Sequence, residues 1–260
     1  MVDLSSGDGA HHRVNLAVLE CRTTDPELGE YFFRMVRAVL LDNPNTTTEQ
    51  GFESALDALV TLFRALERTG TTTIQGLWAE LAIILWSKDP LAALSSWHSS
   101  PRALHDFSAG SFRLEVKSSS RRLREHQFAL DQLATLGEGV TLVASLLLDE
   151  TNDGSSVPDL VKAIATRIGS ESAARLETIV ADSLGNAWRD AIDIRFSVDG
   201  ALTSLRLYPA ERIPSLPQPI PPEVKDVHFT VDLSGTAPLD LADARGRGQL
   251  FEKLLPPKVS

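Results

Sequence analysis

Cysteine is almost absent from this chain, and its scarcity excludes several kinds of site. Cys21 is the only cysteine among 260 residues. No disulfide can therefore form within the chain, and no cluster of thiolates can bind a metal ion. A reducing compartment fits this composition.

Long apolar runs are missing as well. No stretch approaches the roughly 18 apolar residues that indicate a membrane-spanning helix. The N-terminal sequence MVDLSSGDGAHHRVNLAVLECR lacks the charged, apolar and small-residue zones of a signal peptide. We expect a soluble, cytoplasmic protein with no membrane partner. With 43% hydrophobic residues, the chain is long enough to bury a core in one large domain or two small ones.

Positive charge is in short supply. The formal net charge of −10 has the wrong sign for a protein that binds nucleic acid over its whole surface. Any nucleic-acid site must be local or shared with a partner. Arg121, Arg122 and Arg124 form the one dense basic cluster in the middle of the chain. They precede a predicted helix, where cations are disfavoured, so we expect an anionic neighbour such as a DNA phosphate. A solvated loop, or pairing with Glu125, is the alternative.

Apolar periodicity and turn residues predict an alternating order of elements. A strand and a helix come first, two further helices follow, and then a hairpin, a helix and a buried strand. Two more helices precede a second hairpin through Asp199-Gly200, a proline-rich linker and a last strand. The predicted ranges, in that order, are 14–22, 26–42, 47–70, 71–90, 105–120, 124–137, 140–149, 156–168, 170–184, 191–198 with 202–209, 214–223 and 227–234.

These elements suggest four regions. An N-terminal strand and helices occupy residues 1–70, and an α/β core occupies 71–185. A β-rich extension follows over 186–235, and residues 236–260 form a tail. We expect the ARGRGQ sequence at 244–249 to be a mobile part of that tail, because it lacks the strand-turn-helix setting of a phosphate-binding loop.

The first hairpin carries charged residues at a suggestive spacing. Alternation along the strand puts Glu115 and Lys117 on one face, about 7 Å apart, while Leu114 and Val116 point to the other. The turn SAGS brings Asp106 back toward them. The ordinary interpretation is the solvated polar face of a half-buried hairpin.

The same tripeptide occurs a second time, at Glu223-Val224-Lys225. It follows two prolines, which deny a regular ladder of hydrogen bonds, so it reads as an exposed linker. We assign that copy no function, and the chain thereby supplies its own control.

Glu80 favours a functional interpretation of the first copy. It is the only polar residue between Leu77 and Trp86, in a helix that is apolar on every side and so predicted to be buried. A lone ionised carboxylate there is costly unless it is paired, protonated or bound to a cation. A structural salt bridge or a protonated acid is one interpretation. The other is a third carboxylate directed at the same pocket as Asp106 and Glu115.

Three carboxylates and a lysine suit metal-dependent phosphodiester hydrolysis. Carboxylate oxygens bind Mg²⁺ while leaving positions for water and a phosphate oxygen. The metal lowers the pKa of bound water and neutralises charge in the transition state. Lys117 can orient the attacking water or bind the same phosphate.

The chain resembles the PD-(D/E)XK nuclease superfamily, the fold of many restriction endonucleases. That core runs helix, β-hairpin, helix, strand, with Asp and Glu-x-Lys on adjacent strands and often a Glu on the first helix. The resemblance implies an α/β fold with helical N-terminal and β-rich C-terminal additions. It implies metal ligation by Asp106, Glu115 and Glu80 and a catalytic Lys117, with Mg²⁺ as cofactor and Mn²⁺ as a substitute.

A narrower resemblance rests on QGLWAEL, the tryptophan before HDF, LEVKSSS, HQFALDQL, PDLVKAI and LYPAERIP…VHFTVDLS. These stretches resemble an uncharacterised bacterial family of PD-(D/E)XK proteins. Its members lie in restriction or phage-defence gene clusters. The resemblance runs from about residue 74 to 234. It implies auxiliary roles for Gln132 and for His126, at the start of the predicted helix. The chain departs from the superfamily pattern in two respects: His105 replaces the expected proline, and no core strand is visible between Pro90 and Pro101.

The function expected from these observations is Mg²⁺-dependent DNA cleavage by a subunit of a restriction or phage-defence system. Its partners would be DNA, other subunits such as an ATPase, helicase or methyltransferase, and further copies of this chain. The alternative is a nuclease fold kept as a non-catalytic scaffold or recognition subunit. Metal binding discriminates the two.

Overall fold

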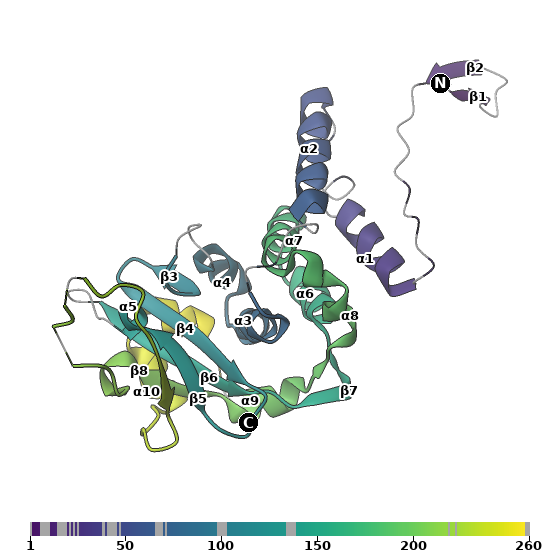
Figure 1. Ribbon diagram of the computed structural model, residues 1–260. Helices are drawn as coiled ribbons and strands as arrows, with labels where there is room; N and C mark the ends of the chain where they lie inside the picture. The colour runs from purple at the N-terminus through teal and green to yellow at the C-terminus, as the bar shows by residue number, and fades with distance from the viewer. Residues whose placement is uncertain are drawn as a thin grey trace. The chain divides into compact units, whose positions relative to one another are not determined.

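A four-stranded mixed sheet forms the centre of the fold (Figure 1). Its order is β3 (Phe107–Ala109), β4 (Phe112–Ser119), β6 (Val140–Leu147) and β8 (Arg206–Pro209). β3 and β4 pair antiparallel through a turn at Gly110, whose φ of 58° suits glycine. β4 and β6 are parallel, and β6 and β8 antiparallel. The predicted first hairpin and buried strand are thus confirmed.

The computed structural model has two compact units, Met1–Arg34 and Met35–Ser260. In the first, β1 (Val2–Ser5) pairs antiparallel with β2 (His11–Val14). Most of the predicted strand 14–22 lies outside the described residues. The described residues are 2–5, 11–14, 20, 22, 24, 26–37, 40, 46, 48–65, 70, 72–97, 103–133, 139–217, 219–221 and 223–257.

The helices before and after the sheet agree with the apolar periodicity. They are α1 (Pro26–Val36), α2 (Glu49–Ala65), α3 (Ile74–Trp86), α6 (Val157–Ala165) and α7 (Ser170–Leu184). α3 is buried from Leu77 to Ile84 and packs with α6 against one face of the sheet. Asp89 caps α4 (Pro90–Ser96), so a helix occupies the stretch where a core strand was sought. The first core strand is β3.

A two-stranded ribbon packs against the other face of the sheet. β5 (Glu125–Ala129) pairs antiparallel with β9 (His228–Asp232). Phe128 of β5 shares a small apolar core with Val143 and Tyr208 of the sheet. The predicted helix 124–137 is therefore wrong over β5, and among the described residues of that stretch only α5 (Leu130–Leu133) is helical. Because no helix begins directly after the arginine cluster, a helix dipole gives no reason to expect an anion beside it. The last strand, β9, is confirmed.

The C-terminal part is more helical than predicted. Ser197 caps α9 (Val198–Ser204) by accepting a hydrogen bond from Gly200 N, so Asp199-Gly200 is no hairpin turn. The predicted strand 191–198 is wrong, since α8 (Asp190–Asp193) occupies its first half. The remaining elements here are β7 (Glu150–Ser155) and the 3₁₀ turns Asn186–Trp188 and Ala210–Arg212.

The predicted mobile tail is also wrong, because its residues fold against the core. α10 (Leu241–Gly246) and α11 (Gln249–Leu254) follow β9. Phe251 and Leu254 of α11 are fully buried in the same core as α3. Within the described residues, no helix has the length and apolarity needed to cross a membrane.

Candidate active site

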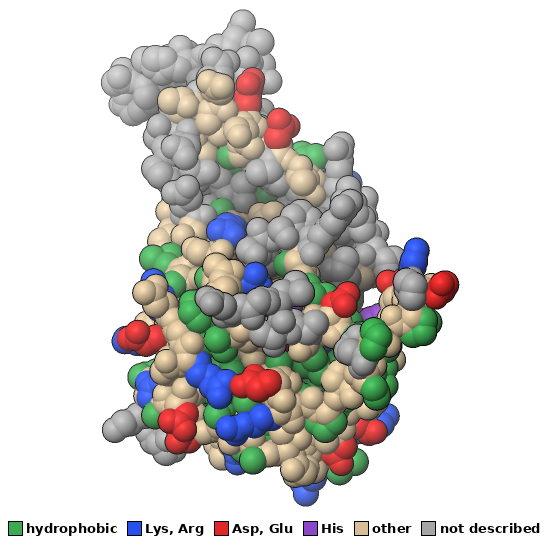
Figure 2. Space-filling view, turned by 90° about the vertical axis from the view of Figure 1, so that its left-hand side faces the viewer, with side chains coloured by type: hydrophobic (Ala, Val, Ile, Leu, Met, Phe, Trp, Pro, Cys, Tyr) green, Lys and Arg blue, Asp and Glu red, His purple; other side chains and the backbone are tan. Residues whose placement is uncertain are grey.

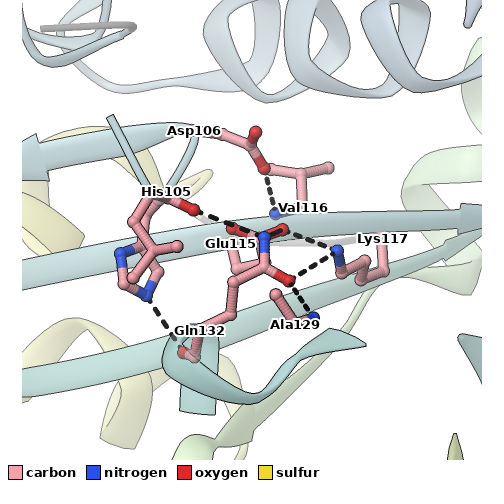
Figure 3. A network of polar contacts seen from close by, with 8 residues as sticks. His105, Asp106, Glu115, Val116, Lys117, Ala129 and Gln132 are labelled. Atoms are coloured by element: carbon pink, nitrogen blue, oxygen red, sulfur yellow. Dashed lines mark hydrogen bonds and ion pairs between the residues drawn. The ribbon is translucent and has the colours of Figure 1, made fainter. Parts of the chain in front are cut away.

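The β3–β4 hairpin brings the predicted acids and lysine together (Figure 3). Asp106 lies one residue before β3, and its Oδ2 accepts a hydrogen bond from Val116 N at 2.6 Å. That amide lies between Glu115 and Lys117 on β4. The Lys117 ammonium lies 2.7 Å from Glu115 Oε1. The hairpin register thus fixes all three side chains.

Glu115 does not lie on a solvated face, contrary to the ordinary interpretation of the hairpin. The residue is 3% exposed, because the β5–β9 ribbon and α5 lie alongside that face. Its Oε1 accepts from Lys117 and, at 2.6 Å, from Gln132 Nε2. Its Oε2 is buried and has no hydrogen-bond partner among the described residues. One oxygen of a buried carboxylate is therefore left to be satisfied by something else.

Gln132 on α5 connects the acid to the lysine. Its Nε2 donates to Glu115, and its Oε1 accepts from Lys117 Nζ at 3.2 Å and from Ala129 N at 3.0 Å. The bond to Ala129 N ties the Gln132 side chain to the backbone just before α5. Gln132, for which the resemblance implied an auxiliary role, thus contacts both charged groups.

Glu80 reaches the same region from α3. It is 5% exposed, and its Oε2 accepts from Trp97 Nε1 at 2.7 Å. Its negative charge raises the pKa values of both Asp106 and Glu115. The structure therefore brings the helical carboxylate within electrostatic range of the other two acids.

Burial governs the ionisation of the two hairpin acids. Loss of solvent raises the pKa of Asp106 well above its usual value, and the charges of Glu115 and Glu80 raise it further. Burial also raises the pKa of Glu115, against the opposing effect of Lys117. Both acids retain a proton to a higher pH than usual, and a bound cation would favour their ionised forms.

The donor set fits a hard divalent cation. Mg²⁺ is usually held by one or two carboxylates and keeps several waters. Asp106 and the unpartnered Oε2 of Glu115 supply two carboxylates next to a lysine. Among the described residues, however, no group of three His, Cys, Asp or Glu side chains is arranged to hold a metal ion. The Asp106 and Glu115 pair is therefore the part of the predicted ligand set that fits, and Glu80 contributes charge from nearby.

His126 lies on β5 and not at the start of a helix. Its Nε2 is 2.7 Å from Ser145 Oγ, on the strand position paired with Lys117. Burial, with the nearby Lys117 and Arg124 charges, lowers its pKa to about 4. The ring is neutral at physiological pH and contacts β6 at Ser145, the residue paired with Lys117.

The three arginines of the basic cluster have different environments. Arg121 and Arg122 are exposed in the loop after β4. Arg124 is half-buried: it donates to Ser145 O and Oγ, at 2.8 Å each, and to Ser204 O. Its guanidinium joins the ribbon to the sheet and α9, so it does not belong to the predicted exposed cluster.

On the face that Figure 2 shows, the described Lys and Arg side chains form no broad basic field. Lys and Arg side chains lie beside Asp and Glu side chains there. This distribution agrees with a protein of net charge −10 that can offer an anion only a local patch.

Two contacts of the site were not predicted from the sequence. Trp97 was noted only as part of the family resemblance, yet its indole holds Glu80. His105 was noted only as a departure from the pattern, yet its Nε2 donates to Gln132 O at 3.0 Å. Burial is the main cause that lowers the His105 pKa, so the ring is neutral. The cost of burying Glu80 without a partner is the one signal that pointed at the first contact.

A mixed sheet with helices, a hairpin carrying Asp and Glu-x-Lys, and a helical acid define a nuclease-like fold of the PD-(D/E)XK kind. Residues 4–234 match the model of the DUF4420 family, whose description reads "Putative PD-(D/E)XK family member". The chain belongs to this family. Comparisons with curated proteins and with solved structures found no match.

Proposed function

We propose that this chain is a Mg²⁺-dependent DNA endonuclease acting as a subunit of a bacterial restriction or phage-defence system, with Mn²⁺ as a substitute cofactor. The observation that carries the proposal is Glu115. Its carboxylate is buried, one oxygen accepts from Lys117 and Gln132, and the other has no partner within the described part of the chain. Such an oxygen beside a second carboxylate is what a hydrated cation would satisfy.

Asp106 and Glu115 would hold the ion, which when bound lowers the pKa of a water and neutralises phosphate charge. Lys117 keeps its ammonium beside Glu115, with its side chain 19% exposed, so it can donate to a phosphate oxygen or to the attacking water. Gln132 fixes the separation of these two groups. Arg121 and Arg122, exposed after β4, would contact the DNA backbone.

The metal dependence of cleavage tests this function. Plasmid DNA is incubated with the purified chain, and with partner subunits where these are required, in Mg²⁺, Mn²⁺, Ca²⁺ or EDTA. We expect cleavage in Mg²⁺ and Mn²⁺, and binding without cleavage in Ca²⁺, which coordinates more loosely and does not fix the water. Equal cleavage in EDTA and in Mg²⁺ would remove the metal mechanism.

A catalytically inactive scaffold or DNA-recognition subunit is the second candidate. It is favoured by the finding that no group of three potential ligands is arranged for a metal in the described part of the chain. Mn²⁺ titration followed by electron paramagnetic resonance separates the two candidates. An enzyme should bind Mn²⁺ in the wild type and lose that site in Glu115→Gln, whereas a scaffold should show no difference between them.

A further inference from the structure

Among the described side chains, Gln132 hydrogen-bonds both Glu115 and Lys117, so whatever holds Gln132 supports the ion pair between these two groups. The described residues of α5, which carries Gln132, make about one helical turn. A single turn has too few internal hydrogen bonds to hold its own position. Within the described part of the chain, contacts from other segments therefore help to place Gln132.

Two hydrogen bonds join Gln132 to the segment just before β3. Its Nε2 donates to Leu104 O at 3.3 Å, and its backbone carbonyl accepts from His105 Nε2 at 3.0 Å. Because a carbonyl oxygen can only accept, the ring must carry its hydrogen on Nε2. The His105 side chain is buried, with 7% of its surface exposed. Figure 3 shows the ring directed from the segment before β3 toward Gln132 on α5.

His105 and Asp106 are consecutive. One holds Gln132, and the other holds the part of β4 that carries Glu115 and Lys117. Asp106 accepts from Val116 N, between Glu115 and Lys117, and His105 holds the backbone of Gln132, which bridges the same two residues. A proline at 105, as in the superfamily pattern, has no side-chain donor and could not form this bond. The departure from the pattern thus supplies a contact.

We propose that His105 is a positioning residue of the Glu115–Lys117 centre, acting through the backbone carbonyl of Gln132. It touches no reacting atom. Removing its donor lets α5 shift, which loosens the bonds from Gln132 to both charged groups. In a site where a displacement of about 1 Å costs up to a hundredfold in rate, we expect a loss in kcat of about tenfold.

Two variants separate the effect of losing the hydrogen-bond donor from the effect of changing the packing at position 105. His105→Phe keeps an aromatic ring in the buried position and removes the donor. His105→Gln offers an amide N–H near the position of Nε2. The first readout is the side-chain amide signal of Gln132 in ¹⁵N-resolved NMR of the full chain, assigned by its disappearance in Gln132→Ala. We expect slow solvent exchange of this amide in the wild type and His105→Gln, and at least tenfold faster exchange in His105→Phe.

The kinetic readout rests on the proposed function. Under cleavage conditions, His105→Phe should lower kcat about tenfold with little change in KM, and His105→Gln should recover to within about threefold. An unchanged Gln132 amide in His105→Phe, with only a lower melting temperature, would show a purely structural role and overturn the proposal. If the wild type cleaves nothing, the proposed function fails, and the amide exchange still decides the role of His105.

Discussion

Asp106 combines burial with two carboxylate neighbours, and all three raise its pKa. The folded protein therefore binds this proton more tightly than the unfolded chain, whose carboxyl titrates near 3.8. The stabilisation from this group is fully present below that value and is lost as the pH rises through the raised folded pKa.

In the metal-free protein, we expect the melting temperature of the wild type relative to Asp106→Asn, which keeps an acceptor for Val116 N, to fall as the pH rises above about 4. Differential scanning fluorimetry in EDTA measures both slopes. Glu223→Gln, in the exposed linker, is the control and should follow the wild type. An identical slope in Asp106→Asn and the wild type would contradict the raised pKa.

At this scale, spacing alone predicted that Glu115 and Lys117 share a face and that Asp106 returns to them. It could not predict that Glu115 is buried, because that depends on a ribbon formed by β5 and by β9, about a hundred residues further along the chain. Nor could it predict the bond from His105 to Gln132, which closes only when the hairpin and α5 are both in place. Contacts between distant segments leave no periodic signal.

Among the elements, the β5–β9 ribbon was the least predictable. β5 alternates exposed and buried residues, with His126 and Phe128 inside. Histidine is a polar residue type, so its burial at position 126 masked the alternation of polar and apolar residues that is typical of a strand. The leucines that follow β5 favoured a helix instead. The arginine before β5 was correspondingly assigned to DNA, whereas it fastens the ribbon to the sheet.

Arg124→Ala should destabilise the protein by about 1–3 kcal/mol, because it leaves the carbonyls of Ser145 and Ser204 and the Ser145 hydroxyl without their donor. Urea unfolding followed by circular dichroism measures this. Arg122→Ala, at an exposed position two residues earlier, should stay within about 0.5 kcal/mol of the wild type. Equal stabilities for the two variants would mean that Arg124 does not anchor the ribbon.

α11 was missed because ARGRGQ was judged only as a phosphate-binding loop and rejected as one, although Leu250, Phe251 and Leu254 directly after it have helical spacing. A Cβ at Gly248 would lie 2.2 Å from Cε1 of Phe112, whose ring packs edge-on against Phe251. We expect Gly248→Ala to cost about 1–3 kcal/mol in unfolding free energy through overpacking. Gly246→Ala is the matched control, since nothing lies within 4 Å of its added Cβ. A neutral Gly248→Ala would contradict the packing of α11 on the hairpin.

Over the whole molecule, the net charge of −10 opposes a nucleic-acid polyanion and leaves attraction to a local patch. We expect the isolated chain to bind DNA weakly, with affinity falling steeply as salt rises. Fluorescence anisotropy with a labelled duplex at several salt concentrations measures this, and a partner subunit should tighten binding. Tight binding by the chain alone, unchanged from low to high salt, would count against the proposed interface.

The repeated tripeptide offers the most direct test of the active site. Glu115 and Lys117 lie beside Asp106 and Gln132, whereas Glu223 and Lys225 are exposed in the proline-flanked linker. The two pairs share composition and differ in context. A Mg²⁺-dependent DNA cleavage assay compares Glu115→Gln, Lys117→Ala, Glu223→Gln and Lys225→Ala, with any required partner subunits present and melting curves as the folding control.

Loss of a ligand carboxylate or of the preorganised ammonium should lower cleavage by about a hundredfold or more, because either change removes charge stabilisation next to the reacting phosphate. Both 115 and 117 variants should remain folded, and the linker variants should cleave and melt like the wild type. Silent 115 and 117 variants in a system whose wild type cleaves, or equal damage from the linker pair, would contradict this assignment of the active site.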